Sequence, residues 1–307
     1  MKHRTYPFIL SFLALPLGLY AWLVVLPFAQ AFQISLTDWS GSTNSFDYIG
    51  LANFAELFDD DRLVMPAIRH TAVILVVLPA VTIALGLFFA FMLNVGGKVT
   101  RGRVEGVPGA RFHKIVFFFP QVLSVAIIAI IWRQVYAPPN FGGLLSRALE
   151  TVGLPAPANG FLATKEFVLI AVISVLVWSS VGFYLVYFSS AMAAIPRDIY
   201  EAAILDGAGR VQTFFRVTLP LLFESVQTAW IYLSIVALDA FVLVYVMTPE
   251  KGGPDGHSEV VGGAIWKLAF PQGEQALASA LGVVLFFVSL SIAVIALRFG
   301  RKDSIEL

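Results

Sequence analysis

Polar side chains interrupt two long apolar stretches of this sequence, and their spacing places them on helix faces. One group, separated by 3, 4 and 7 residues, is Ser225, Thr228, Tyr232 and Asp239. At about 100° per residue, a helix holds these four within an arc of roughly 60°. A second group, from an earlier stretch, shares a face in the same way: Ser180, Tyr184 and Tyr187. Hydroxyl groups beside aromatic rings suit a small polar ligand, which needs hydrogen-bond partners and apolar surfaces.

Asp239 is the most informative of these residues. A carboxylate near the centre of a bilayer costs roughly 2.5–3.5 kcal/mol, so Asp239 is not expected to face lipid. It could bind a ligand hydroxyl, or it could pair with a cation on a second membrane subunit. The serines and tyrosines fit a binding path, but they also fit ordinary packing and hydrogen bonding between helices.

Several other kinds of chemistry are excluded. The chain has no cysteine, which rules out disulfides and thiolate catalysis. Its four histidines fall at the ends of apolar stretches or between them. Gly96-Gly97-Lys98 is followed by Val99 and lacks the upstream glycine, so it is not a phosphate-binding loop. We expect no cofactor, no metal site and no catalytic activity in this chain.

The composition fixes the class of protein. Of 307 residues, 58% are hydrophobic and 13% charged, and the mean hydropathy is +0.83. Soluble domains carry roughly 25% charged residues, so this chain is not a soluble enzyme or a nucleic-acid-binding protein. Runs without Asp, Glu, Lys or Arg cover 8–37, 71–97, 167–196 and 275–297. Runs of 18 or more apolar residues can cross the bilayer, which indicates a helical membrane protein.

We predict six spans in a single domain that covers residues 1–307. They are 7–33, 69–95, 113–137, 167–194, 218–248 and 275–299. The third and fifth are less regular, because one ends at Arg133 and the other contains Asp239. Ala29-Gln30-Ala31 resembles a signal-peptidase site, but the apolar run before it is too long for a signal peptide. We therefore expect the first span to be retained.

The basic residues predict the orientation. Thirteen Lys and Arg lie in the N-terminus, the second-to-third and fourth-to-fifth connections and the C-terminal tail, against seven on the other side. By the positive-inside rule, both termini and these two connections are cytoplasmic. Net charge is zero, so there is no global attraction to polyanions.

The fourth-to-fifth connection, residues 195–222, predicts two short helices outside the membrane. Asp198 could cap a helix over Ile199 to Leu205, and Gly207 suits a left-handed end to it. Tyr200, Ala203 and Ile204 would share one face of that helix. A second helix would pass through Phe214 and Phe215, with Pro220 in the first turn of the next span. Such a pair could dock another protein, or it could rest on lipid headgroups.

This segment resembles the EAA motif of binding-protein-dependent ABC importer permeases. The motif residues are Glu201-Ala202-Ala203, then Gly207, then Val217-Thr218-Leu219-Pro220, with valine for the usual isoleucine. Weaker landmarks over residues 16–299 resemble the carbohydrate-uptake permeases, in particular the first membrane subunit of maltose, lactose and glycerol-phosphate systems. They are Ser35 to Asp38, Gly50 to Phe54, Phe119-Pro120 with Trp132, Gly142 to Leu144 and Gly252 to Pro254. Phe241-Val242 departs from the family's Phe-Asp.

The resemblance implies a docking role for residues 195–220. In the family, this loop enters a cleft of a cytoplasmic ATPase. Glu201 would be the charged contact, Ala202 and Ala203 would be small enough to enter, and Gly207 would allow the turn. The other motif-segment residues assigned to the loop are Asp206, Leu219 and Pro220. A second permease subunit, two ATPase copies and an extracytoplasmic solute-binding protein would complete the importer.

Two other functions compete with this one. An ion-coupled secondary transporter would use Asp239, but it predicts inverted repeats and more intramembrane charges. A membrane-embedded enzyme would need an acid–base pair that the spans lack. The expected fold is therefore all-α, with five core spans and a peripheral first span in the cell (inner) membrane. The sequence leaves open which sugar or sugar derivative would be carried.

Overall fold

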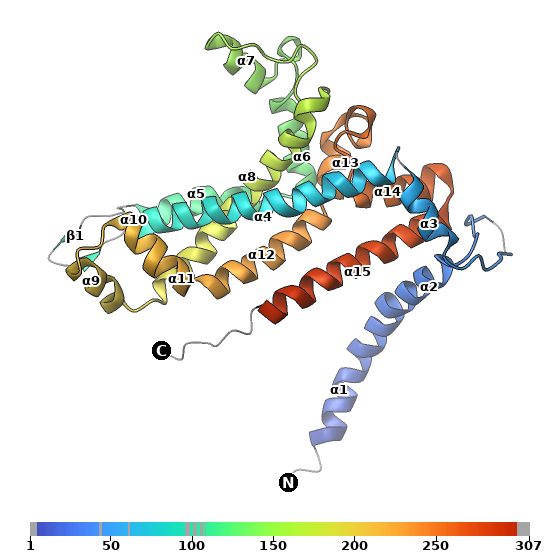
Figure 1. Cartoon of the computed structure of the whole chain (residues 1–307), viewed down its shortest axis with the longest axis horizontal. Coiled ribbons are helices and arrows are strands. Elements are labelled where there is room, and N and C mark those ends of the chain that lie inside the picture. The colour runs from blue at the N-terminus through green and yellow to red at the C-terminus, as the bar shows by residue number, and fades with distance from the viewer. Residues whose placement is uncertain are drawn as a thin grey trace. The chain divides into compact units, whose positions relative to one another are not determined.

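The computed structural model describes residues 5–42, 45–60, 62–95, 99–100, 103–104, 107 and 109–299. These residues are predominantly helical, as the sequence predicts (Figure 1). Two short strands, β1 (Val99–Thr100) and β2 (Arg103–Val104), pair antiparallel with Val99 opposite Val104. Among the described residues, four apolar helical stretches are long enough to cross a membrane, and two bent helix pairs would raise the number to six. The all-α membrane fold is thus confirmed.

The long helices follow the charge-free runs. The first run forms α1 (Thr5–Tyr20), a π-helical turn η2 (Ala21–Val25) and α2 (Leu26–Ile34). The others form α4 (Val64–Val95), α8 (Lys165–Ala193) and α15 (Gln275–Phe299). Helix is the required form there, because lipid offers no partner for backbone N–H and C=O groups.

The third apolar stretch is bent. Helices α5 (Ala110–Val122) and α6 (Val125–Val135) meet at 99° around Leu123 and Ser124, where the sequence predicts one span over 113–137. The physical cause is local. Pro120 supplies no N–H near the end of α5, and the Ser124 hydroxyl accepts a bond of 3.4 Å from Ile127 N to cap α6.

The fifth stretch, expected over 218–248, is also interrupted. A helix over Arg210–Leu221 comprises α10 (Arg210–Thr213), a π turn η4 (Phe214–Thr218) and α11 (Leu219–Leu221). After Leu222 the chain turns by 71° into α12 (Phe223–Leu238). A second break at Asp239 and Ala240 precedes α13 (Phe241–Met247). Pro220 therefore lies in the last turn of the first segment rather than the first turn of α12.

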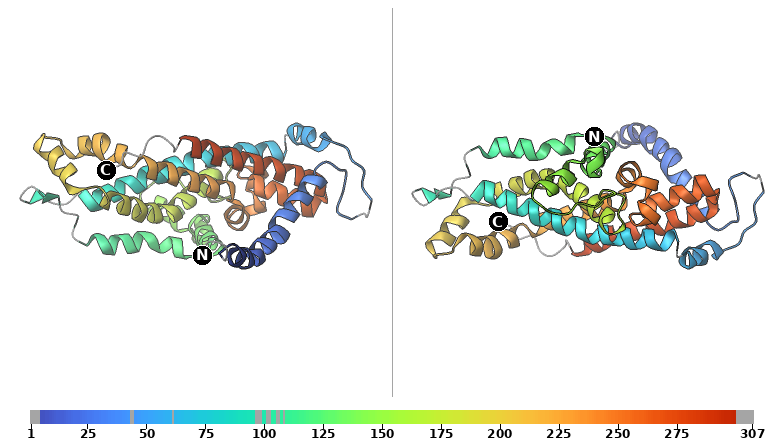
Figure 2. Two further views of the ribbon diagram at one scale, coloured as in Figure 1. Left: turned by 90° about the horizontal axis from the view of Figure 1, so that it is seen from below. Right: turned by 90° about the horizontal axis from the view of Figure 1, so that it is seen from above.

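The chain forms two compact units. The larger comprises the described residues of Pro66–Gly263 and Ser289–Leu307, and its core joins α4, α6, α8, α12 and α13. Figure 2 shows α4, α8 and α12 running alongside one another. Fully buried side chains there include Ile74, Leu78, Leu185, Phe188 and Leu233. Beyond α6, η3 (Pro139–Phe141) and α7 (Leu144–Thr151) complete the connection to α8.

The smaller unit comprises the described residues of Met1–Met65 and Ala264–Val288. The rings of Phe28 and Phe32 contact Phe286 at 5.5 and 5.9 Å between centroids. In α3 (Ala52–Asp59), the buried Asn53 amide donates to the carbonyls of Ser35 and Thr37, both at 2.8 Å. The segment after α2 is thereby held in place. It belongs to one of the landmark stretches of the sequence.

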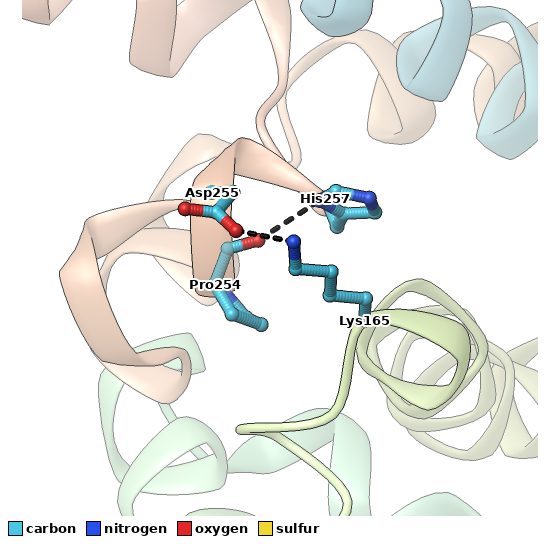
Figure 3. Close-up of polar contacts among 4 residues, drawn as sticks. All are labelled: Lys165, Pro254, Asp255 and His257. Carbon is cyan, nitrogen blue, oxygen red and sulfur yellow. Dashed lines mark hydrogen bonds and ion pairs between the residues drawn. The ribbon is translucent and has the colours of Figure 1, made fainter.

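A strained loop follows α13 in the larger unit. It contains η5 (Pro249–Lys251) and η6 (Pro254–Gly256), and it leads into α14 (Val261–Lys267) and η7 (Leu268–Gln272). Glu250, Lys251 and Asp255 have φ of 56°, 54° and 50°, which non-glycine residues rarely adopt. An ion pair between Asp255 and Lys165 joins the loop to the start of α8 (Figure 3).

Candidate functional site

Helix α9 (Arg197–Leu205) begins the segment that the sequence marks as a docking element. It starts two residues before the predicted Ile199, and its N-cap is Pro196. Asp198 is therefore not the cap and makes no capping hydrogen bond, contrary to the prediction. Proline can precede a helix because its fixed φ and extended ψ suit that position. Asp198 still favours the first turn, where its charge complements the helix dipole.

The two faces of α9 differ as its pattern predicts. Tyr200 and Ala203 are 8% and 9% exposed, and they lie towards the rest of the chain. Burial raises the pKa of the Tyr200 hydroxyl, so Tyr200 is neutral at physiological pH. On the other face Ala202 is exposed and Glu201 half-buried. Of the two alanines, then, only Ala202 faces outward.

Gly207 forms the turn after α9. Its φ is +78°, its N–H donates to Ile204 O at 3.0 Å, and the next N–H, from Ala208, donates to Ala203 O at 2.9 Å. This pair of bonds is the Schellman arrangement, which satisfies the last carbonyls of a helix. A β-carbon on Gly207 would meet no atom within 4 Å, so the backbone conformation alone requires glycine here. The exposed Asp206 precedes it.

The second helix of the segment is anchored in the larger unit. Thr213 and Thr218 are buried, and the Thr213 hydroxyl donates to Gly209 O at 3.1 Å. The ring of Phe214 contacts Phe91 of α4, with 5.0 Å between centroids. Helix α9 packs against η4 and β2. The π-helical turn η4 therefore contacts both α9 and α4 and connects these two helices.

A polar cluster joins α4, α5 and α8 near the C-terminal end of α4. Asn94 donates to the hydroxyl of Ser189 in α8 at 2.9 Å and accepts from Lys114 of α5 at 3.2 Å. It also donates to Ala90 O at 2.6 Å. In Figure 1, α9, α10 and β1 gather at this end of α4. The two-helix segment is thus attached where α4, α5 and α8 are tied together.

The polar residues predicted to line a path occupy different environments. Ser180 and Tyr184 are 8% and 6% exposed, and Tyr184 belongs to the hydrophobic core of the larger unit. Tyr187 is half-buried, with its ring 6.3 Å from that of Tyr184. The sequence predicts that these three residues share one face of α8. In the structure Tyr187 is the most accessible of them, because Ser180 and Tyr184 are buried.

The polar residues predicted on the α12 segment are more accessible than those of α8. Thr228 is half-buried and donates to Glu224 O at 2.9 Å in its own helix. Tyr232 is 61% exposed. Asp239 is exposed at the break after α12, where its N–H donates to Ile235 O at 3.1 Å. A carboxylate therefore sits at a helix interruption.

Sequence reasoning missed a buried carboxylate. Glu259 is 1% exposed, and one of its oxygens accepts from Val260 N at 3.3 Å. The main-chain carbonyl oxygen of Glu259 is 3.1 Å from Nδ1 of His70 in α4. Next to it, Val261 N donates to the Thr71 hydroxyl at 3.0 Å. His70 lies in the second turn of α4, which begins at Val64. The nearby Gly252-Gly253-Pro254 landmark was the only signal for this region.

The part of the chain that the structure describes contains no group of three or more His, Asp or Glu residues that could hold a metal ion. Its distinctive features are instead an anchored helical knob, residues 197–221, and a bent apolar bundle with polar groups at its interruptions.

Comparisons with known proteins agree on one kind of molecule. Residues 4–302 match the family model described as binding-protein-dependent transport system inner membrane component. The chain is 40% identical over 295 residues to the diacetylchitobiose uptake system permease protein NgcF of Streptomyces coelicolor, covering 96% of this chain and 82% of that protein. It is 32% identical over 292 residues to the multiple sugar-binding transport system permease protein MsmF of Streptococcus mutans, covering 95% and 94%.

A solved structure shares the fold. It is a bacterial alginate ABC transporter in complex with an alginate pentasaccharide-bound periplasmic protein. Its matching chain aligns with a TM-score of 0.79 at 21% identity, covering 98% of this chain and 96% of that one. At this identity the likeness supports the fold alone.

Proposed function

The chain belongs to the family of binding-protein-dependent transport system inner membrane components, and from that premise we propose how it binds its ATPase and carries its substrate. The family predicted from the Glu-Ala-Ala segment is confirmed, and the chain is a multi-pass inner-membrane permease subunit of an ABC importer. The proposal concerns three finer points: the docking residues, the translocation path and the partners.

We assign docking to the outward face of the helical knob. Glu201 and Ala202 lie on the accessible side of α9, followed by Asp206 and Gly207. A small, partly acidic surface suits insertion into a cleft with a basic residue, where the Glu201 carboxylate would pair with Arg or Lys of the ATPase. Ala203 is buried and would support the docking surface from within the chain, whereas the half-buried Leu219 and the exposed Pro220 could extend that surface along the second helix.

The single observation that carries this proposal is the anchoring of the knob to α4. Phe214 contacts Phe91, and Asn94 bridges α4 to Ser189 of α8. When ATP closes the ATPase pair, displacement of α9 would move α4 and α8 together. Packed helices shift as bodies rather than deforming continuously, so this linkage would convert closure into an inward-to-outward transition.

We place the translocation path along the exposed face of α12. Tyr232 offers an aromatic ring and a hydroxyl, and Asp239 offers a carboxylate at a helix break. Broken helices at membrane depth are tolerated where they line a water-filled cavity or are buried in protein. Thr228 and Tyr187 are further candidates, whereas the buried Ser180 and Tyr184 would act by positioning them.

We propose that the cargo is a short sugar. The relatives named above are an uptake permease for diacetylchitobiose and a permease of a multiple-sugar-binding system, and hydroxyl-bearing and aromatic residues on α12 fit such a ligand. A second permease subunit, two ATPase copies and an extracytoplasmic binding protein would complete the importer. Both termini and the knob would face the cytoplasm, as the basic residues indicate.

Affinity purification of the tagged chain from its native membranes in mild detergent tests the docking assignment. An ATPase and a second permease should co-purify with the parent chain. With Glu201→Ala and Gly207→Pro together, the ATPase should be lost and the second permease retained. Asp198→Asn, which changes a charge elsewhere on α9, is the matched control and should retain both. A chain purified as a homo-oligomer without an ATPase would contradict the proposal.

The cargo is tested separately. Vesicles containing the purified complex and its binding protein should accumulate labelled diacetylchitobiose or a related short sugar only when ATP is supplied. If the complex hydrolyses ATP with its binding protein but accumulates none of a panel of sugars, the sugar assignment is wrong. The docking assignment would be unaffected by that result.

A further inference from the structure

An apolar groove runs between α4 and the helices that follow α9. Its volume is about 700 Å³, and it lies wholly within the larger unit. On α4 it follows one stripe from Ala80 to Met92, at the spacing of a single helix face. Its other wall comes from Phe214, Phe215 and Leu219, and Trp230 of α12 completes it.

One end of the groove is basic. Arg210, the first residue of α10, lines the apolar groove and also a second, open hollow of about 790 Å³. That hollow is lined as well by Gly209, Gln212 and Arg216. Both arginines are exposed, and none of the described residues lining the two hollows is acidic. The site therefore combines an apolar interior with a polar, doubly cationic mouth.

The length of the groove matches one leaflet. From Ala80 to Met92 is twelve residues, which at 1.5 Å each spans about 18 Å. Half of the roughly 30 Å hydrocarbon core is about 15 Å. A transmembrane helix of a partner would need a groove across the whole bilayer.

We propose that this groove holds an acyl chain of an anionic phospholipid whose phosphate lies at Arg210 and Arg216. The proposal rests on the cytoplasmic placement of the knob, which sets the mouth at the headgroups of the inner leaflet. Guanidinium groups bind phosphate in a bidentate manner, and basic pockets beside membrane helices recognise anionic headgroups. The lipid would contact Phe214 and Phe215 and so rest directly against the base of the knob.

The function of this lipid would be to hold the base of the knob against α4. Phe214 contacts Phe91, and both rings line the groove. An occupied groove keeps this contact packed, whereas an empty one leaves the rings facing a void. The structure thus assigns to an anionic lipid a place in the linkage between the ATPase and the membrane helices.

Trp230 provides a direct probe, since it lines the groove. The purified complex is reconstituted in phosphatidylcholine with increasing brominated phosphatidylglycerol or, separately, brominated phosphatidylcholine. The Trp230 signal is the fluorescence difference between the parent and Trp230→Phe. With two arginines at the mouth, half-maximal quenching should need about tenfold less brominated phosphatidylglycerol than brominated phosphatidylcholine.

Two variants separate the parts of the site. Arg210→Gln with Arg216→Gln should remove the preference for phosphatidylglycerol and leave the weaker quenching by phosphatidylcholine. Ala84→Phe should fill the groove and reduce quenching by both lipids. Equal quenching of the parent by the two lipids would mean bulk contact only, and no quenching by either would mean that protein covers the groove. Each of these results overturns the proposal.

The measurement does not depend on transport. A chain that lost its ATPase or carried another cargo would still report lipid through Trp230. A failed docking experiment together with lipid selectivity would therefore disprove the proposed docking and leave the lipid site standing.

Discussion

The main chain of Phe117 in α5 lies directly against Gly182 in α8. A β-carbon placed on Gly182 would sit 1.8 Å from the Phe117 carbonyl oxygen and 2.9 Å from the next nitrogen. Such distances leave no room for any side chain, because the obstructing atoms belong to the backbone. Small residues allow membrane helices to approach this closely, and packing there replaces the hydrophobic driving force available in water.

We therefore predict that Gly182→Ala strongly destabilises the protein. Either α5 or the whole of α8 must shift, and overpacking of this kind costs about 1–3 kcal/mol or more. Thermal unfolding in detergent measures the effect. Gly282→Ala in α15 is the matched control, because nothing lies within 4 Å of an added β-carbon there. The control should gain up to about 1 kcal/mol from its better helix propensity. Equal melting temperatures for the two variants would contradict the α5–α8 contact.

Two buried threonines on α4 give opposite predictions. The Thr71 hydroxyl accepts from Val261 N, whereas the Thr82 hydroxyl has no hydrogen-bond partner among the described residues. Thr71→Val leaves a buried N–H without its acceptor and should cost about 1–3 kcal/mol. Thr82→Val removes a buried hydroxyl that makes no hydrogen bond among the described residues, so the free energy of unfolding should stay the same or rise. Thermal unfolding distinguishes them, and a larger loss at Thr82 would mean that the two environments are misassigned.

The sequence predicts the helices well because the bilayer imposes a simple rule on them. Long charge-free runs must be helical, and α4, α8 and α15 follow those runs closely. The bends escape this rule, since Leu123 and Leu222 are apolar residues within stretches that hydropathy marks as single spans. Pro120 and Pro220 were visible signals, but a proline inside a membrane helix does not determine whether the chain continues or turns.

Part of the site was predictable for a similar reason. The Gly207 turn and the buried Tyr200 depend on local pattern, and both agree with the structure. The burial of Glu259 depends on contact with His70, 189 residues away along the chain, which hydropathy cannot reveal. Tyr184 likewise satisfies the spacing of a path residue, yet the packing of neighbouring helices buries it.

The Gly207 turn yields a prediction about ATPase coupling. Gly207→Ala forces an alanine into a left-handed conformation, which should destabilise the turn by roughly 1–2 kcal/mol. We expect the C-terminal end of α9 to fray as a result. Gly207→Pro should abolish uptake while the protein still inserts, since φ of +78° is inaccessible to proline. ATP-dependent uptake, normalised to the amount of inserted protein, measures both variants.

Gly209→Ala is the control for the turn. Its φ is −70° and its surroundings are equally open, so alanine fits without strain. A small loss of capping preference should be offset by a lower entropy of the unfolded chain. Uptake by Gly209→Ala should match the parent. Normal uptake by well-inserted Gly207→Pro would remove the docking role from this turn.

The ion pair between Lys165 and Asp255 predicts a pH dependence of the loop after α13. The Lys165 ammonium lowers the pKa of the Asp255 carboxyl below its ordinary value. A lowered pKa means that the stabilisation is complete above the ordinary value near 4 and is lost as pH falls through the lowered value. Protection of the 249–259 amides against hydrogen exchange should therefore exceed that of Asp255→Asn at neutral pH and converge with it in acid.

Salt provides the control for this pair. Both side chains are largely exposed, so raising ionic strength at neutral pH should reduce the difference between parent and Asp255→Asn. A difference that persists unchanged in acid and in high salt would show that the strained backbone of Asp255, rather than its charge, holds the loop.

Asp239 allows the two interpretations of its carboxylate to be separated. If it binds a sugar hydroxyl, Asp239→Asn keeps a hydrogen-bonding group and should lower uptake only partly, about tenfold, whereas Asp239→Leu should abolish it. If it pairs with a cation on the second permease, both variants lose the ion pair equally. Co-purification of that subunit should then fall to the same extent in Asn and Leu variants.

Tyr232→Phe completes the test. Its ring is exposed on the same face of α12, and the substitution keeps the ring while removing the hydroxyl. A path that binds sugar should show a raised half-saturation concentration for transport in Tyr232→Phe and in Asp239→Asn, with subunit co-purification unchanged in both. An effect of Asp239→Asn on co-purification, with none from Tyr232→Phe, would assign Asp239 to the subunit interface. The path would then have to follow another face of the bundle, because α12 would be covered at its break.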